Sequence, residues 1–233
     1  MTDNLFKFKQ YETEIILLCV RWYLKYPLSY RMLVEMMSER GLNISHTTIM
    51  RWVLQYSPII EKRMRNHIKS TNDSWRMDET YIKIKGKNAY LYRAVDSEGK
   101  TIDFLVSEKR DKEAAKIFFK KALKSSHNDM PRVITTDKYA ATEFAINEMK
   151  SSSIFSSDSI LRKIKYLNNI IEQDHRFIKK KIKPMLGFKT LKTAEQTISG
   201  IEIMHMVKKG QVEKIQCVLS EIKFINKIMG VVA

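Results

Sequence analysis

Glycine, proline and cysteine are all scarce in this chain of 233 residues, which contains 7, 4 and 2 of them. So few glycines and prolines argue against a disordered or fibrous chain. Cys19 and Cys217 are far apart in apolar contexts, so we expect buried thiols and neither a disulfide nor a metal site. The longest apolar run, residues 15–20, is far too short for a membrane span, and charges interrupt the N-terminus. We therefore expect a cytoplasmic protein with no membrane partner.

Positive charge is abundant. The chain has 42 lysines and arginines against 26 acids, a net charge of +16. Such a chain attracts polyanions, and nucleic acid is the first candidate. A basic but merely solvated surface is the alternative. The clustering favours a polyanion, because residues 162–192 carry ten basic residues against two acids.

The N-terminal residues 1–62 have the pattern of a helical DNA-binding domain. Ser29 can cap one helix, Gly41 supplies a turn with positive φ, and Ser45 can cap a second helix that reaches about Tyr56, before Pro58. Helix, short turn and capped helix form a helix-turn-helix, although an ordinary helical hairpin has the same pattern. On the second helix we expect Ile49, Trp52 and Val53 to point inward, and these residues to point outward toward DNA: His46, Thr47, Thr48 and Arg51.

After a basic linker at residues 63–74, the sequence changes from a helical pattern to one rich in residues that favour β-strands. Residues 75–190 predict the order β-β-β-α-β-α-β-α, an α/β layered domain with a mixed sheet. The last β element is expected at residues 162–167 and the helix before it at residues 139–150. Residues 191–233 look helical.

Three acids occupy special positions in this layout: Asp78 within the first strand, Asp137 at the end of the fourth and Glu172 near the start of a later helix. If the first and fourth strands are neighbours, these carboxylates cluster. Clustered carboxylates repel one another unless cations join them, and oxygen ligands favour Mg²⁺ or Mn²⁺. Two such ions suit phosphoryl transfer.

Each acid also has a structural alternative. Glu79 could replace Asp78, although strand alternation puts only one of the two on a given face. Asp137 could cap the next helix. Glu172 follows Asn169 by three residues, the spacing of a capping box.

Helical spacing places Glu172, His175, Arg176 and Lys179 on one face. With Lys180, these cations are candidates for holding DNA phosphate beside a metal. A solvated face with ion pairs is the alternative.

Several long blocks resemble one known family: "SWRMDETYIKIKGK", "YLYRAVDSEGKTIDFLVS", "VITTDKYAA", "KYLNNIIEQDHRFIKKKIKPMLGFK" and "GIEIMHMVKKGQ". They are similar to the Asp-Asp-Glu transposases of bacterial insertion sequences, in particular the insertion-sequence-six family. The 34 residues between Asp137 and Glu172 match the spacing of that family, and Lys179 matches the basic residue that follows its glutamate.

The resemblance implies a ribonuclease-H-like catalytic domain like that of retroviral integrases, behind the helix-turn-helix. It implies that Asp78, Asp137 and Glu172 are the catalytic metal ligands, with two Mg²⁺ or Mn²⁺ ions per site. It also implies binding of the terminal inverted repeats, metal-dependent strand cleavage, transfer of the 3′-hydroxyl to target DNA and cointegrate formation. The expected protein is a nucleoid-associated bacterial homo-oligomer.

Two other functions remain open from the sequence. A sequence-specific DNA-binding regulator would use the acids only structurally and would bind DNA without regard to Mg²⁺. A different metal nuclease would nick DNA without joining it.

Overall fold

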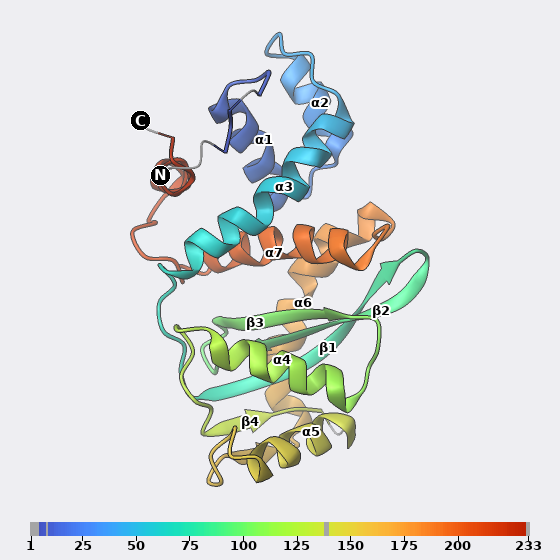
Figure 1. Ribbon diagram of the computed structural model, residues 1–233, viewed down its shortest axis with the longest axis vertical. Coiled ribbons are helices and arrows are strands. Elements are labelled where there is room, and N and C mark those ends of the chain that lie inside the picture. The colour runs from blue at the N-terminus through green and yellow to red at the C-terminus, as the bar shows by residue number, and fades with distance from the viewer. Residues whose placement is uncertain (1–4, 8, 138–139, 232–233) are drawn as a thin grey trace. The chain divides into compact units, whose positions relative to one another are not determined.

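The computed structural model describes residues 5–7, 9–137 and 140–231, and the chain divides into two compact units (Figure 1). The helical unit combines Met1–Ile68 with Glu195–Ala233, and the sheet unit is Lys69–Ala194. We expected four consecutive segments with boundaries at residues 62, 74 and 190. The structure instead groups the C-terminal segment with the N-terminal helices, so the sheet unit is inserted within the helical unit.

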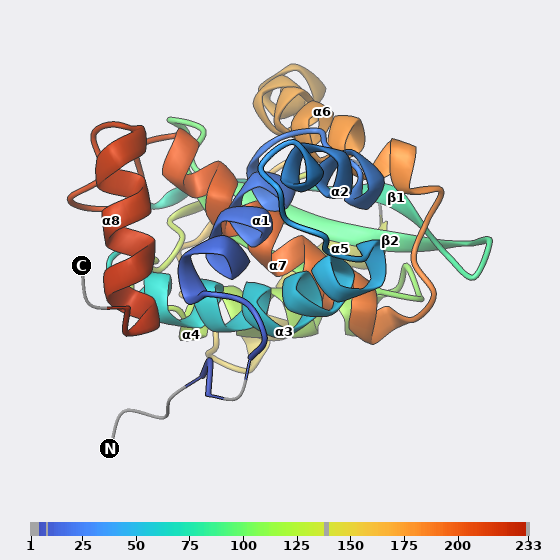
Figure 2. The same ribbon diagram turned by 90° about the horizontal axis from the view of Figure 1, so that it is seen from above.

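Five helices form the helical unit (Figure 2): α1 Thr13–Lys25, α2 Tyr30–Ser38, α3 His46–Arg65, α7 Leu191–Lys208, of which the first turn precedes the unit boundary, and α8 Val218–Met229. In α7, a Cβ on Gly200 would lie 2.7 Å from side-chain atoms of Leu24 and Ser57, so glycine allows α7 to approach α1 and α3 closely. The buried carboxylate of Glu221 in α8 accepts hydrogen bonds from Arg21 at 2.9 Å and from Lys25 at 2.6 Å. These contacts join the C-terminal helices to the N-terminal ones.

Helices α2 and α3 begin where the sequence predicts. The Ser29 and Ser45 hydroxyls accept hydrogen bonds from the third backbone N–H of their helices, and Gly41 has φ +73°. The predicted end of the second helix is wrong, because α3 continues through Pro58 to Arg65. Proline removes one N–H from the helix interior. Burial of Ile60 and Met64 on the core side offsets that loss.

The sheet unit contains five strands in the order β3-β2-β1-β4-β5: β1 Ser74–Ile84, β2 Lys87–Val95, β3 Thr101–Ser107, β4 Val133–Thr135 and β5 Ile160–Arg162. The pairs β1–β2 and β2–β3 are antiparallel, whereas β4 is parallel to both β1 and β5. This is the mixed sheet of a ribonuclease-H-like fold. The predicted order of elements is confirmed. Strand β5 begins two residues earlier than predicted and is only as long as its neighbour β4.

Helices cover both faces of this sheet (Figure 1). Helices α4 (Lys112–Lys124) and α5 (Ala140–Ser151) share a core with Trp75, Met77 and Tyr92 on one face. Helix α6 (Asn169–Ile182), between the short 3₁₀ helices η1 (Lys165–Asn168) and η2 (Lys183–Met185), packs against β1 and β2 on the other. The start of the helix predicted at residues 139–150 falls at residue 139, outside the described residues.

The two cysteines differ in their exposure to solvent. Cys19 is buried as predicted. The predicted burial of Cys217 is wrong, because this residue is the N-cap of α8 at the surface, where its Sγ accepts a hydrogen bond from the Ser220 N–H. Among the described residues, no helix combines the length and apolar character needed to cross a bilayer.

Candidate active site

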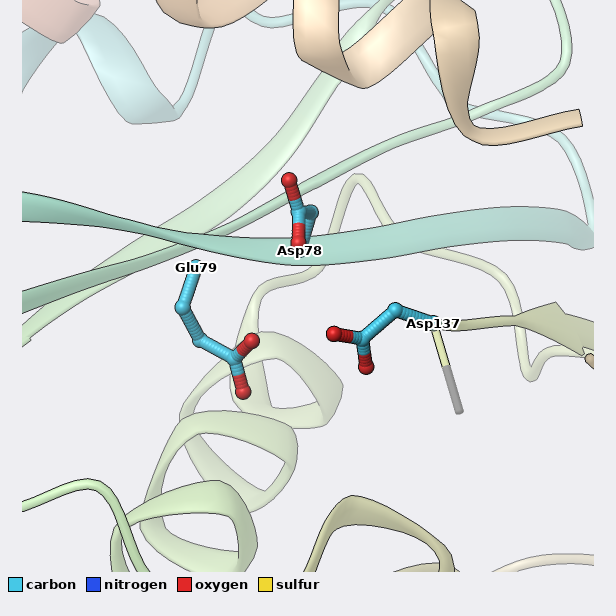
Figure 3. A group of neighbouring side chains, drawn as sticks. All are labelled: Asp78, Glu79 and Asp137. Carbon is cyan, nitrogen blue, oxygen red and sulfur yellow. The ribbon is translucent and has the colours of Figure 1, made fainter. Parts of the chain in front are cut away.

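Three carboxylates meet where β4 ends beside the middle of β1. Strand β4 pairs with the first residues of β1, Ser74–Arg76. Asp137 follows its end by two residues, and Asp78 and Glu79 follow Arg76 on the neighbouring strand. Oxygen atoms of these three side chains all lie within 4.8 Å of one another. Figure 3 shows the carboxylates of Glu79 and Asp137 turned toward one another beside β1, with Asp78 on the strand near them.

One arginine lies between two of these acids. Arg110, in the loop between β3 and α4, donates to Glu79 at 3.2 Å and to Asp137 at 3.3 Å. The Thr142 hydroxyl lies 3.4 Å from the other Glu79 oxygen. Burial raises the pKa of Glu79 to about 7. Arg110 opposes this rise, whereas Asp137 and Asp78 add to it. Burial thus favours the neutral form of Glu79, whereas Arg110 favours its charged form.

Asp78 is held from the opposite face of β1 by a chain of buried side chains on β2 and α6. Arg93, which is fully buried, donates to Asp174 at 2.7 Å and lies 3.5 Å from Nδ1 of His175. Because arginine can only donate, Nδ1 accepts, and the imidazole proton is on Nε2. That N–H donates to the carboxylate of Asp78 at 3.2 Å. This hydrogen-bonded chain fixes both the tautomer of His175 and the position of the Asp78 oxygen.

The residues present fit a divalent metal ion. The cluster offers three carboxylates and no sulfur, the ligand type that Mg²⁺ and Mn²⁺ prefer. The Arg110 guanidinium between two of the acids shows that this site accommodates a positive charge. Buried hydrogen-bond partners behind a ligand, such as those of Asp78, are typical of metal sites.

Glu172 lies outside the group of carboxylates whose oxygen atoms come within 4.8 Å of one another among the described residues. It is an exposed residue in the first turn of α6, three residues before His175, which bonds Asp78. Residues at that spacing are neighbours on a helix surface, about 5–6 Å apart at Cβ. Glu172 thus lies one helical turn from His175, the partner of Asp78. The capping alternative has no support, because the N-cap is Asn168 and no side chain caps the helix.

The expected outward face of α6 needs one correction. Arg176, Lys179 and Lys180 are exposed as predicted, but His175 is only 2% exposed and bonds Asp78. Helix α6 buries a stripe that includes Ile171, His175, Ile178 and Ile182, at helical spacing. His175 belongs to that stripe, so its predicted DNA contact is wrong for this structure.

The candidate recognition residues of the helical unit lie at the surface, as the pattern predicts. Ile49, Trp52 and Val53 are buried against the core of that unit. The outward set is exposed, apart from Thr48, which is half-buried and bonds Ser45: His46, Thr47, Thr48 and Arg51.

The sequence did not identify Glu79, Arg110, Arg93 and Asp174 as parts of this site. Glu79 was expected only as an alternative to Asp78, because neighbouring strand residues point to opposite faces. Asp137 lies at the strand edge, however, where its carboxylate is within reach of both. A buried arginine in a strand, such as Arg93, requires an acidic partner. An arginine within a predicted strand was therefore the feature of the sequence that could have indicated the pair with Asp174. Arg110 lies in a loop, and no pattern in the sequence indicated its contact with the acids.

Comparison with known proteins places the chain in a family. Residues 72–211 match the family model of the DDE domain of IS240-type transposases. The transposase of the insertion-sequence-like element IS431mec from Staphylococcus aureus strain Mu50 is 38% identical over 213 residues, covering 91% of this chain and 92% of that protein. The transposase of IS257 in transposon Tn4003 from Staphylococcus aureus gives the same identity and coverage.

Among solved structures, the HTLV-2 integrase catalytic core domain in complex with magnesium (trimeric form) is 18% identical. The match has a TM-score of 0.43 and covers 55% of this chain and 84% of that one. The sequence matches, which cover more than half of the chain in one case and most of it in the other, decide the family. The chain belongs to the DDE transposases of bacterial insertion sequences, within the insertion-sequence-six family.

Proposed function

We propose that this transposase cuts DNA at the ends of its element and joins the freed ends to target DNA in a reaction that depends on divalent metal ions. Water forms a bond to the phosphorus at the element end, the P–O3′ bond breaks, and the proton ends on the released 3′-oxygen. The 3′-hydroxyl then attacks a target phosphodiester. A new P–O3′ bond forms, and the target strand leaves with its own 3′-hydroxyl.

The observation that carries this proposal is the meeting of Asp78, Glu79 and Asp137 within 4.8 Å, with Glu172 one helical turn from the partner of Asp78. Three carboxylates gathered at one strand edge repel one another, which is unfavourable without cations. Asp78, Asp137 and Glu172 are the proposed metal ligands. Glu79 is the alternative third ligand, because its oxygen is already in the cluster.

When bound, two divalent ions supply activation of the attacking oxygen and stabilisation of the leaving oxygen. The side chains of the protein hold the reactants around them. His175 and Arg93 keep one Asp78 oxygen in a fixed position, and Arg110 offsets part of the negative charge of Glu79 and Asp137 before the ions bind. No carboxylate has to transfer a proton.

Basic side chains of both units bind the DNA in this proposal. On α6, the exposed Arg176, Lys179 and Lys180 follow Glu172 and contact phosphates beside the metal ligands. In the helical unit, the start of α3 enters the major groove of the terminal inverted repeats, with contacts from His46, Thr47, Thr48 and Arg51. Pairing of two ends requires a homo-oligomer, and the family resemblance supports a replicative, cointegrate-forming reaction.

Strand transfer tests the proposal. Purified protein is mixed with a labelled duplex of the element end and a supercoiled target, with Mg²⁺ or EDTA. We expect joined products only with Mg²⁺, and their loss in Asp137→Asn. Asp129→Asn, a change at an exposed loop aspartate, is the matched control and should retain activity.

Other outcomes identify the rival functions. Repeat binding that ignores both Mg²⁺ and Asp137→Asn, without any broken strand, would indicate a regulator. Nicks that require Mg²⁺ but never produce joined DNA would indicate a nuclease.

A further inference from the structure

A basic groove lies at the hairpin end of the sheet unit. It encloses about 420 Å³, within the range of small-ligand pockets of about 300–1,000 Å³. The hairpin end of β1 and β2, the last turn of α6 and the segment after it form its walls. The lining residues used in the proposal below are Tyr81, Lys83, Lys179, Lys183, Leu186 and Phe188.

The segment after α6 is fixed against β1, so this groove has a defined wall. The Phe188 N–H donates to the Lys83 carbonyl at 2.7 Å, and the Lys85 N–H donates to the Phe188 carbonyl at 2.8 Å. A Cβ at Gly187, which has φ +102°, would lie 2.8 Å from Cβ of Lys83. Only glycine therefore allows this approach. The resulting turn presents Leu186 outward.

Exposed apolar surface and positive charge occur together in the groove. Tyr81 is 58% exposed and Leu186 is 92% exposed, high values for large apolar side chains. The three lysines of the groove are exposed, and within the described part of the chain none of them forms an ion pair with a carboxylate. Aromatic surface flanked by lysines is the combination that binds unpaired nucleotides, because bases stack on the ring and phosphates pair with the cations.

Strand β1 carries both the carboxylates and a wall of the groove. On the edge opposite β2, the described residues that pair with β1 are β4 at Ser74–Arg76 and Phe188 at Ile84. Tyr81 lies in the open stretch between them. It is two strand residues beyond Glu79, about 7 Å along the strand. A DNA strand whose phosphate lies at the acids and which follows this edge reaches Tyr81 within a few nucleotides.

We propose that this groove holds one unpaired base of the DNA strand next to the reacting phosphate. The base packs against Tyr81 and Leu186, and the flanking phosphates lie on Lys83, Lys179 and Lys183. This inference rests on the proposed function, because it uses the same DNA strand. It adds a separation of the base pairs at the element end, which opens the duplex beside the metal ligands.

Photocrosslinking tests the location of the base. The probe is a duplex of the element end with 5-iododeoxyuridine at each of the last few positions in turn, bound to the full chain with Ca²⁺ in place of Mg²⁺. We expect one position to crosslink to Tyr81, and mass spectrometry identifies the residue. Tyr81→Phe should keep the crosslink, because the ring remains. Phe144→Leu, at an exposed aromatic residue of α5 outside the groove, should also keep it.

Affinity gives a second, independent readout. Tyr81→Ala should weaken binding of that duplex about tenfold, the contribution expected of one stacked base. An abasic site at the crosslinking position should cause the same loss, and combining both changes should cause no further loss. Additive losses, or crosslinks confined to residues outside the groove, would overturn the inference and indicate a paired duplex end.

Strand transfer is measured with the same protein preparations and element-end duplexes, now with Mg²⁺ and a supercoiled target, to separate the two proposals. Normal strand transfer without the Tyr81 crosslink rejects the groove and leaves the proposed function intact. A Tyr81 crosslink in a protein that never joins DNA rejects the proposed reaction and supports the groove.

Discussion

Asp78 and Glu79 are consecutive residues with opposite surroundings. Behind Asp78 lies the chain of Arg93, His175 and Asp174, in which the arginine side chain is fully buried. Beside Glu79 lies Arg110, a loop residue whose side chain is 26% exposed. Both acids thus have a basic neighbour. That of Asp78, His175, is buried and has hydrogen-bond partners at both ring nitrogens, whereas Arg110 is partly exposed.

The difference indicates how rigid each side of the site is. Asp78 is preorganised, because moving it would leave buried polar groups without partners. Asp137 and Glu79 share one partially solvated guanidinium, whose positive charge a metal ion can replace. We infer that the Asp78 side positions the ion and that the Arg110 side adjusts to it.

The largest expected effect on the strand-transfer rate comes from replacing the third metal ligand, for which Glu172 and Glu79 are the two candidates. If Glu172 is the ligand, Glu172→Gln should lower the strand-transfer rate about a thousandfold, which corresponds to about 4 kcal/mol of transition-state stabilisation. Glu79→Gln should lower it only about tenfold, because the amide oxygen can still accept from Arg110. The measurement is single-turnover strand transfer at saturating Mg²⁺, with thermal unfolding to verify that both variants fold. The reverse order would assign the third ligand to Glu79.

A smaller effect is expected where Asp78 is held. His175→Leu removes the N–H that bonds Asp78, and loss of such a partner costs about 10–100-fold in metal affinity. Mn²⁺ binding measured by calorimetry gives this value without any reaction. His175→Gln can place an N–H near the original Nε2, so it should recover part of the affinity. Equal Mn²⁺ affinity in all three proteins would show that His175 only fills space.

The smallest effect concerns Lys181, on the buried side of the same helix α6. Burial lowers the pKa of Lys181 to about 7 from its ordinary value of 10.5. Between these values the unfolded chain binds more protons than the folded one, so the folded protein gains stability as pH rises through this window. Compared with Lys181→Met, the wild type should gain on the order of a few degrees in Tm between pH 7 and 9. Parallel Tm curves for the two proteins would contradict the burial of a neutral amine.

Local patterns predicted much of this structure. Serine caps, a glycine turn and alternating strands gave the element order. They assigned Asp78 to the first strand and Asp137 to the end of the fourth, and the structure shows that these strands are neighbours. Local patterns did not predict contacts between residues far apart in the sequence. Helical spacing grouped His175 with Glu172, but it could not show which side of α6 the sheet covers. Pro58 predicted the end of a helix, whereas buried residues beyond it kept α3 intact.

The return of the chain to the helical unit at Glu195 has a consequence for synthesis. Since a ribosome makes the N-terminal helices first, Arg21 and Lys25 must wait until almost the whole chain has emerged before Glu221 can pair with them. A product that stops before α8 therefore has an incomplete helical unit, in which Arg21 and Lys25 lack Glu221. The same connectivity that inserts the sheet unit also makes the stability of the helical unit a check on full-length translation.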